Sequence, residues 1–100
     1  MDRFAGMSEG LHKAKSGLIR ALIKVEDNRL TDVVIGGDFI LVPEYYIDRM
    51  EKALIGAEAS NREISKRLEV FFENESFQSP ATGPDDFARA FAAALEAQNG

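Results

Sequence analysis

The chain has 100 residues, of which 45% are hydrophobic and 29% are charged, and its net charge is −5. This length and composition indicate one globular domain with a single core. The acidic balance argues against sequence-independent nucleic-acid binding, and the absence of cysteine excludes disulfides, thiolate catalysis, iron–sulfur clusters and Cys-type zinc sites.

The chain begins with polar, glycine-containing residues that follow no period. We predict a flexible arm over residues 1–11, followed by a single domain over residues 12–100. The arm lacks the apolar core of about 7–15 residues that a signal peptide needs. No apolar run in the sequence approaches the roughly 18 residues of a membrane span. These features together predict a soluble, cytoplasmic protein without a membrane partner.

Alternating side chains predict a first strand at residues 17–25. One face of this strand is apolar and consists of Ile19, Ala21, Ile23 and Val25. The other face mixes leucine with cations and consists of Leu18, Arg20, Leu22 and Lys24. Residues 26–29 predict a turn with Asn28 in the left-handed conformation, and residues 30–35 predict a second, antiparallel strand. The wholly apolar residues 39–42 predict a third strand, buried on both faces.

Three helices are predicted from their end signals and their apolar periodicity. Pro43 and Glu44 favour a first helix start, and Gly56 favours its end. Residues 60–63 form a capping box for a second helix, and Pro84 begins a third. This order predicts an α+β fold with a three-stranded, mostly antiparallel sheet followed by about three helices packed on it.

No residue pattern in the sequence describes a self-sufficient active site. His12 is the only histidine, so a cluster of histidine ligands cannot form. Asp38 is the one acid inside an apolar stretch. We predict that its carboxylate accepts main-chain N–H groups at the turn over residues 36–37 or faces the next helix start, in preference to a catalytic or metal role. Neither of the common glycine-rich phosphate loops occurs.

Two adjacent tyrosines follow the predicted helix start. Tyr45 and Tyr46 must point about 100° apart on a helix, so both cannot face inward. An exposed tyrosine close to the glycine turn would suit an interface anchor.

One part of the sequence resembles the C-terminal accessory domain of lipoate-protein ligases. In that family a lysine precedes a glycine turn and a strand, and a hairpin then leads to Gly-Asp-Phe, a proline and a helix that ends in Leu-x-Gly. The corresponding residues here are 13–19, the turn at 26–29, 33–39, Pro43 and 54–56. The resemblance is clear over about residues 12–56 and continues weakly to the segment Pro84–Leu95. It departs from the family pattern at Ser16-Gly17, where the family commonly has Gly-Gly.

This resemblance implies a non-catalytic small subunit of a two-chain lipoate-protein ligase. In the family, the large domain binds ATP and lipoate, makes lipoyl-adenylate and transfers the lipoyl group to a lysine of a carrier domain. The small domain is needed mainly for the adenylation step. The chain alone is then expected to bind no cofactor, and ATP, Mg and lipoate are expected to act through the catalytic partner. Lipoyl carrier domains would be indirect partners.

The residue patterns and the resemblance together suggest which residues face the partner or a phosphate group. The candidates are Lys13, Lys15, Gly17, Gly37, Asp38, Phe39 and Tyr46, and no catalytic or metal-binding residue is expected in this chain. A docking role further predicts an exposed apolar patch beside residues 36–39. One alternative is a stand-alone scaffold or a sulfur-transfer-like protein, against which the missing cysteine argues. Another is a small autonomous enzyme, for which the sequence supplies no convergent polar groups.

Overall fold

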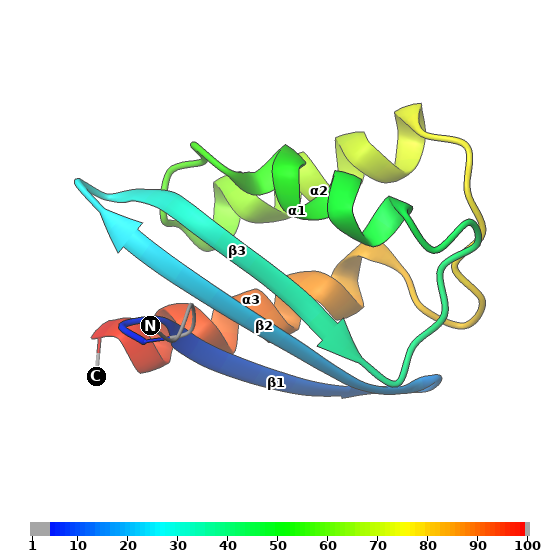
Figure 1. Cartoon of the computed structure of the whole chain (residues 1–100), viewed down its shortest axis with the longest axis horizontal. Coiled ribbons are helices and arrows are strands. Elements are labelled where there is room, and N and C mark those ends of the chain that lie inside the picture. Colours follow the sequence, from blue (N-terminus) through cyan, green and yellow to red (C-terminus); the bar gives the residue numbers. More distant parts are fainter. Residues whose placement is uncertain (1–4, 100) are drawn as a thin grey trace.

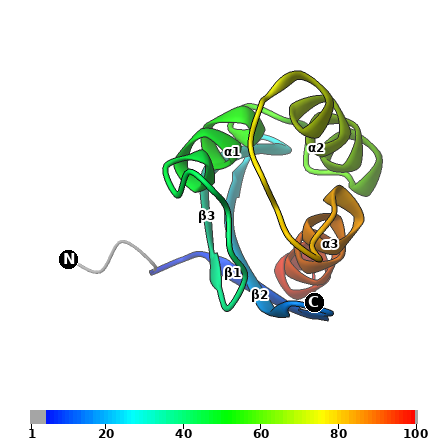
Figure 2. The ribbon, with the colours of Figure 1, turned by 90° about the vertical axis from the view of Figure 1, so that its right-hand side faces the viewer.

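The computed structural model describes residues 5–99 and shows an α+β fold (Figure 1). A three-stranded antiparallel sheet in the order β1-β2-β3 has its helices on one face (Figure 2). The elements are β1 (Ser8–Ala14), β2 (Gly17–Glu26), β3 (Arg29–Gly37), α1 (Tyr46–Leu54), α2 (Asn61–Asn74) and α3 (Pro84–Asn99). The predicted fold class is therefore confirmed.

One edge strand of the sheet differs from the prediction. Residues 8–14 form β1, which pairs with β2 from Ser8 opposite Ile23 to Ala14 opposite Gly17. The expected loose arm over residues 1–11 is therefore wrong from residue 8 onward, while its residues 1–4 lie outside the described part of the chain. The sequence does not predict this strand, because two of its positions toward the helices hold Gly10 and His12 in place of apolar side chains.

The apolar residues 39–42, predicted as a strand, form an irregular segment instead. Phe39 and Leu41 point into the core and are 8% and 4% exposed. Val42 makes an isolated antiparallel bridge with Gln78. Ile40 and Val42 are 61% and 48% exposed, so the prediction of a strand buried on both faces is wrong: only alternate residues of this segment pack under the end of the sheet.

The hairpin and the helix ends follow the sequence signals closely. Asn28 has a φ of 63°, as predicted, and Asp27 before it has 51°, so the two residues close a tight turn between β2 and β3. The hydroxyl of Ser60 accepts the N–H of Glu63 at 3.2 Å and caps α2. The start of α1 differs from the prediction. Pro43 lies in the preceding turn, where its carbonyl accepts the N–H of Tyr46 at 3.2 Å.

The core lies between the covered face of the sheet and the helices. Its central side chains are fully buried and come from β2, α2 and α3: Ile19, Ala21, Ile23, Leu68, Phe87 and Phe91. A fully buried side chain of this size contributes about 1.5–3 kcal/mol to stability. α3 lies so close to β1 that a Cβ at Gly10 would be 2.1 Å from the Ala90 carbonyl oxygen. Gly10 therefore allows the backbone of the helix to pack directly on the strand.

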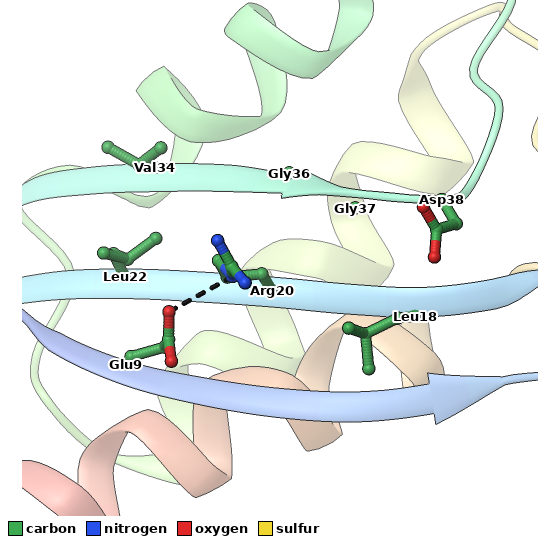
Figure 3. Close-up of a pocket in the computed structure, with 8 residues that line it drawn as sticks. All are labelled: Glu9, Leu18, Arg20, Leu22, Val34, Gly36, Gly37 and Asp38. Carbon is green, nitrogen blue, oxygen red and sulfur yellow. Dashed lines mark ion pairs between the residues drawn. The ribbon is translucent and has the colours of Figure 1, made fainter.

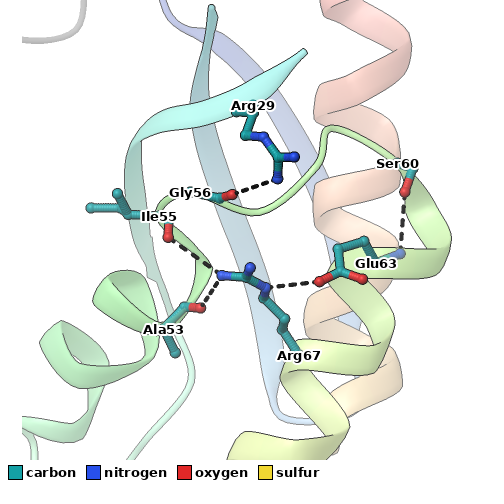
Figure 4. A network of polar contacts seen from close by, with 7 residues as sticks. All are labelled: Arg29, Ala53, Ile55, Gly56, Ser60, Glu63 and Arg67. Carbon is teal, nitrogen blue, oxygen red and sulfur yellow. Dashed lines mark hydrogen bonds and ion pairs between the residues drawn. The ribbon is translucent and has the colours of Figure 1, made fainter. Parts of the chain in front are cut away.

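Two arginines attach the segment between α1 and α2 to its surroundings (Figure 4). Arg67 donates to Glu63 at 3.0 Å and to the carbonyls of Ala53 and Ile55 at 3.3 and 3.4 Å. Arg29 donates to the Gly56 carbonyl at 3.2 Å. The carbonyls at and just after the end of α1 have no N–H partner within the helix, and the two arginines donate to them instead.

The same segment covers the start of the free edge of β3. Leu30 donates to the Ala57 carbonyl at 2.9 Å, and Gly56 donates to the Leu30 carbonyl at 2.8 Å. Farther along this edge, the N–H of Ile35 donates to Glu51 of α1 at 2.7 Å. These contacts satisfy main-chain N–H and C=O groups at the edge of β3 that could otherwise pair with another strand.

A last polar contact joins the first two helices at their other end. Arg49 of α1 donates to Glu75, the residue after α2, with a distance of 2.6 Å between Nη2 and Oε1. This hydrogen bond raises the pKa of Arg49 above its ordinary value. None of the helices in residues 5–99 is both long enough and apolar enough to cross a bilayer.

Candidate functional site on the open face of the sheet

One face of the sheet is left uncovered by the helices of residues 5–99 (Figure 2). Side chains alternate along a strand, so the residues between the buried positions of β2 must point to this open face. A groove of about 560 Å³ runs across it, and Figure 3 shows its lining. The lining residues are Glu9, Leu18, Arg20, Leu22, Val34, Gly36, Gly37 and Asp38. Its apolar side chains are Leu18, Leu22 and Val34, and it lies next to residues 36–39, where a docking role predicts an exposed apolar patch.

A single ion pair crosses the middle of the groove. Arg20 of β2 and Glu9 of β1 lie 3.1 Å apart between Nε and Oε2, and their side chains are 53% and 45% exposed (Figure 3). An ion pair this exposed contributes about 0–1 kcal/mol to stability because water screens it. The pair therefore matters little to the fold, but it places one charge of each sign among leucine and valine side chains.

Gly36 forms the part of the groove opposite Arg20, and the two residues are paired in the register of β2 and β3. A Cβ built at Gly36 would meet no atom of the described chain within 4 Å, and the residue is not in the left-handed region. At Gly37 the opposite holds, because its φ is 135° and a Cβ would be 2.1 Å from the Leu18 carbonyl oxygen. The fold therefore requires Gly37 and does not require Gly36.

Three of the sequence-predicted site residues meet at one end of the groove. Gly17 has a φ of 138°, and a Cβ there would be 2.8 Å from the Cβ of Asp38. Next to it, the N–H of Asp38 donates to the Leu18 carbonyl at 2.7 Å. The contact is made by the main chain of Asp38. The expected bond from its carboxylate to the glycine turn is not among the hydrogen bonds of residues 5–99.

The two candidate lysines lie near the same end of the sheet and are exposed. Lys13 of β1 pairs in register with Leu18, so it shares the open face, and Lys15 lies in the turn between β1 and β2. In that turn the hydroxyl of Ser16 is hydrogen-bonded to the hydroxyl of Thr82, a buried residue before α3. Ser16, where the sequence departs from Gly-Gly, thus anchors the turn to the helical layer.

The remaining two candidates lie elsewhere. Phe39 is 8% exposed and packs edge-to-face on Phe87, with ring centroids 5.0 Å apart, so it is a core residue instead of a partner-facing one. Tyr46 is half-buried and stacks on Phe77 at 5.1 Å. The exposed member of the tyrosine pair is Tyr45, at 61%. The prediction that both cannot face inward is confirmed, but the exposed side chain is that of Tyr45, whose ring stacks on Tyr46 with centroids 4.9 Å apart.

Several residues of the groove were not among the sequence-based candidates: Glu9, Leu18, Arg20, Leu22, Val34 and Gly36. One signal for them is present in the sequence. Leu18 and Leu22 occupy strand positions that a solvated face would fill with polar residues. The other groove residues depend on the pairing of three strands, and β1 was not predicted.

The chemistry of this face suits contact with a protein better than catalysis. Among residues 5–99, no group of three or more histidine or acidic side chains is arranged to hold a metal ion. The face offers apolar side chains, one ion pair and an empty position above a glycine.

Comparison with known proteins identifies relatives of the chain. The family model described as bacterial lipoate protein ligase C-terminus matches residues 9–91. Lipoate-protein ligase A subunit 2 of Thermoplasma acidophilum is 38% identical over 78 residues, which cover 78% of this chain and 80% of that protein.

A solved structure from the same organism is also similar. It belongs to a structural analysis of an archaeal lipoylation system, described as a bipartite lipoate protein ligase and its E2 lipoyl domain. The matching chain has a TM-score of 0.77 and 34% identity, and the match covers 85% of this chain and 93% of that one.

Proposed function

Because the chain belongs to the family of bacterial lipoate protein ligase C-termini, we propose that it is the accessory subunit of a two-chain lipoate-protein ligase. The observation that carries the proposal is the match to 93% of a chain from a bipartite ligase. A relative of nearly the same extent works there as one part of a two-part ligase. The accessory role and the partner, a catalytic lipoate-protein ligase subunit, follow for this chain.

The proposed division of labour leaves the chemistry to the catalytic subunit. That subunit binds ATP, Mg and lipoate, and the carboxylate of lipoate displaces pyrophosphate from ATP to give lipoyl-adenylate. The amine of a lysine on a lipoyl carrier domain then displaces AMP and takes the lipoyl group. The accessory chain supports the first step and meets the carrier domain only through its partner. Both subunits work in the cytoplasm.

The physical reason for an accessory subunit lies in the demands of adenylation. Forming an acyl-adenylate gains from excluding water and from holding the carboxylate in line with the phosphorus that it attacks. A small, rigid domain that docks beside the site provides both effects without adding a reactive group. Lys13 and Lys15 remain candidates for contact with a phosphate group, since both are exposed near one end of the open face.

The test is reconstitution with the catalytic subunit from the same organism. Lipoate-dependent exchange of labelled pyrophosphate into ATP measures the adenylation step. We expect no exchange with the accessory chain alone, slow or no exchange with the catalytic subunit alone, and fast exchange when the two are mixed in equal amounts. The transfer step is measured separately, by supplying preformed lipoyl-adenylate and a lipoyl carrier domain.

Two outcomes would contradict the proposal. In one, the catalytic subunit adenylates lipoate equally fast without the accessory chain. In the other, the accessory chain neither binds the catalytic subunit in calorimetry nor changes its exchange rate. An unrelated acidic protein of about the same size, added at the same concentration, controls for non-specific stabilisation of the catalytic subunit.

A further inference from the structure

We infer that the open face of the sheet, centred on Gly36, is the surface that docks on the catalytic subunit, with a segment of that subunit lying directly over Gly36. The inference rests on the proposed function and adds the place and manner of contact.

A glycine inside a strand weakens it, because glycine loses more conformational freedom on folding and contributes no side chain to packing. Such a glycine is usually explained by a left-handed φ or by a close neighbour. Gly36 has neither, since a Cβ there would meet nothing within 4 Å among residues 5–99. The pairing of β2 with β3 is regular at Gly36, so a bulge does not explain this glycine either. A strand glycine can also let another molecule approach the backbone closely. The empty position above Gly36 is where a segment of the catalytic subunit would approach the strand.

The surroundings of Gly36 are suited to a protein segment. Leu18, Leu22 and Val34 line the groove and are only half-buried, so a covering segment would remove their apolar surface from water. Leu11 pairs in register with Arg20, and its side chain is 46% exposed. The Arg20–Glu9 pair in the centre can bond to polar groups of a partner and thereby select among partners.

The size of the face shows how far the interface must extend. Strands about 4.8 Å apart with about 3.3 Å per residue give this three-stranded face an area on the order of 400 Å². A stable interface buries about 800 Å² on each partner. The loop that leaves the groove after Asp38 supplies further surface, because Ile40, Val42 and Tyr45 are 61%, 48% and 61% exposed. The docking surface therefore comprises the open face and residues 40–45.

The catalytic subunit fits this surface better than a second copy of the chain. The similar solved chain belongs to a ligase made of two parts, so a partner of another kind exists for a protein with this fold. In a two-fold contact whose axis passes through Gly36, the empty position at Gly36 of one copy would face that of the other. Such a contact would leave a void where packing is needed.

The test fills the space above Gly36 without disturbing the fold. Gly36→Leu places a side chain into the open groove, and we expect its thermal unfolding to match that of the wild-type chain. We expect its affinity for the catalytic subunit, measured by calorimetry, to fall about tenfold or more. The matched control is Gly83→Leu, at a glycine just before α3 where a Cβ also meets no described atom within 4 Å.

The possible outcomes separate this inference from the proposed function. If the wild-type chain binds and Gly36→Leu binds equally well, the docking face is wrong and the accessory role stands. If Gly36→Leu and Gly83→Leu lose affinity to the same degree, the face is also wrong. If the wild-type chain does not bind the catalytic subunit at all, the proposed function fails first.

Two further measurements keep the test decisive. If Gly36→Leu does not fold, Leu11→Arg replaces it, because that side chain lies exposed on the same face; unchanged affinity of a folded Leu11→Arg variant then overturns the inference. Light scattering detects self-association. A wild-type dimer that Gly36→Leu converts to a monomer, with affinity for the catalytic subunit retained, would assign the face to a second copy and overturn the inference.

Discussion

Gly10 lies on the sheet face that the helices cover, and Gly36 lies on the face that they leave open. A Cβ at Gly10 would be 2.1 Å from a carbonyl oxygen of α3, whereas one at Gly36 meets no atom of residues 5–99 within 4 Å. Packing among residues 5–99 accounts for the first glycine and gives no cause for the second. A residue that weakens its strand for no internal gain is evidence about contacts outside the chain.

The two faces differ in the same way at neighbouring residues of β2. Ile23 is fully buried under the helices, and Leu22 beside it is half-buried in the groove. Both are large and aliphatic, so they differ in surroundings far more than in size. On the covered face, side chains stabilise this domain; on the open face, we expect them to stabilise a complex.

The largest expected effect separates these two neighbours. Ile23→Ala removes fully buried methyl groups and leaves a cavity, so we expect it to lower the free energy of unfolding by about 2–5 kcal/mol. Leu22→Ala, partly exposed already, should lower it by roughly 1 kcal/mol or less. Chemical denaturation of the isolated chain measures both. If both variants lost the same free energy of unfolding, the open face would be packed as firmly as the core, and the two faces would not differ in the way described.

A smaller effect is expected from alanine at the two glycines. Gly10→Ala forces β1 and α3 apart, and overpacking of this kind costs about 1–3 kcal/mol. Gly36→Ala restricts the unfolded chain without meeting a neighbour, so we expect it to be neutral or to stabilise by about 0.4–1 kcal/mol. Thermal unfolding of the pair tests this. A destabilised Gly36→Ala variant would show that the chain itself needs this glycine.

The smallest effect is expected at the ion pair of the groove. Because both side chains are about half exposed, Glu9→Gln, Arg20→Gln and the double variant should each change stability by no more than about 1 kcal/mol. A double-mutant cycle gives the interaction energy between the two residues. A coupling well above that range in the isolated chain would show that the pair serves the fold itself.

Local sequence signals predicted much of this structure. The alternation in β2, the left-handed Asn28, the Ser60 cap and the start of α3 at Pro84 are all confirmed. Each depends on neighbouring residues along the chain, where steric and hydrogen-bonding preferences act directly. The resemblance that indicated a lipoate-protein ligase domain also depends on spaced local features, and it led to the family that the comparisons identify.

Where the sequence misled, distant parts of the chain decided the outcome. β1 was missed because Gly10 is explained only by α3, some eighty residues away in the chain. Residues 39–42 look like a buried strand, but only Phe39 and Leu41 fill space beneath the sheet, with Phe39 packed on Phe87, while Ile40 and Val42 are exposed. For the same reason Phe39 was placed at the candidate site although its side chain faces the core.

The sequence by itself thus determined the fold class, the family and most element ends, because these follow from the properties of nearby residues. Only the tertiary structure decided that β1 pairs with β2 and which face of the sheet the helices cover. It also brought residues of β1, β2 and β3 together in one groove. The physical reason is that pairing and packing join residues far apart in the chain. The sequence alone does not distinguish Gly10, which has no room for a side chain, from Gly36, which has room for one among residues 5–99.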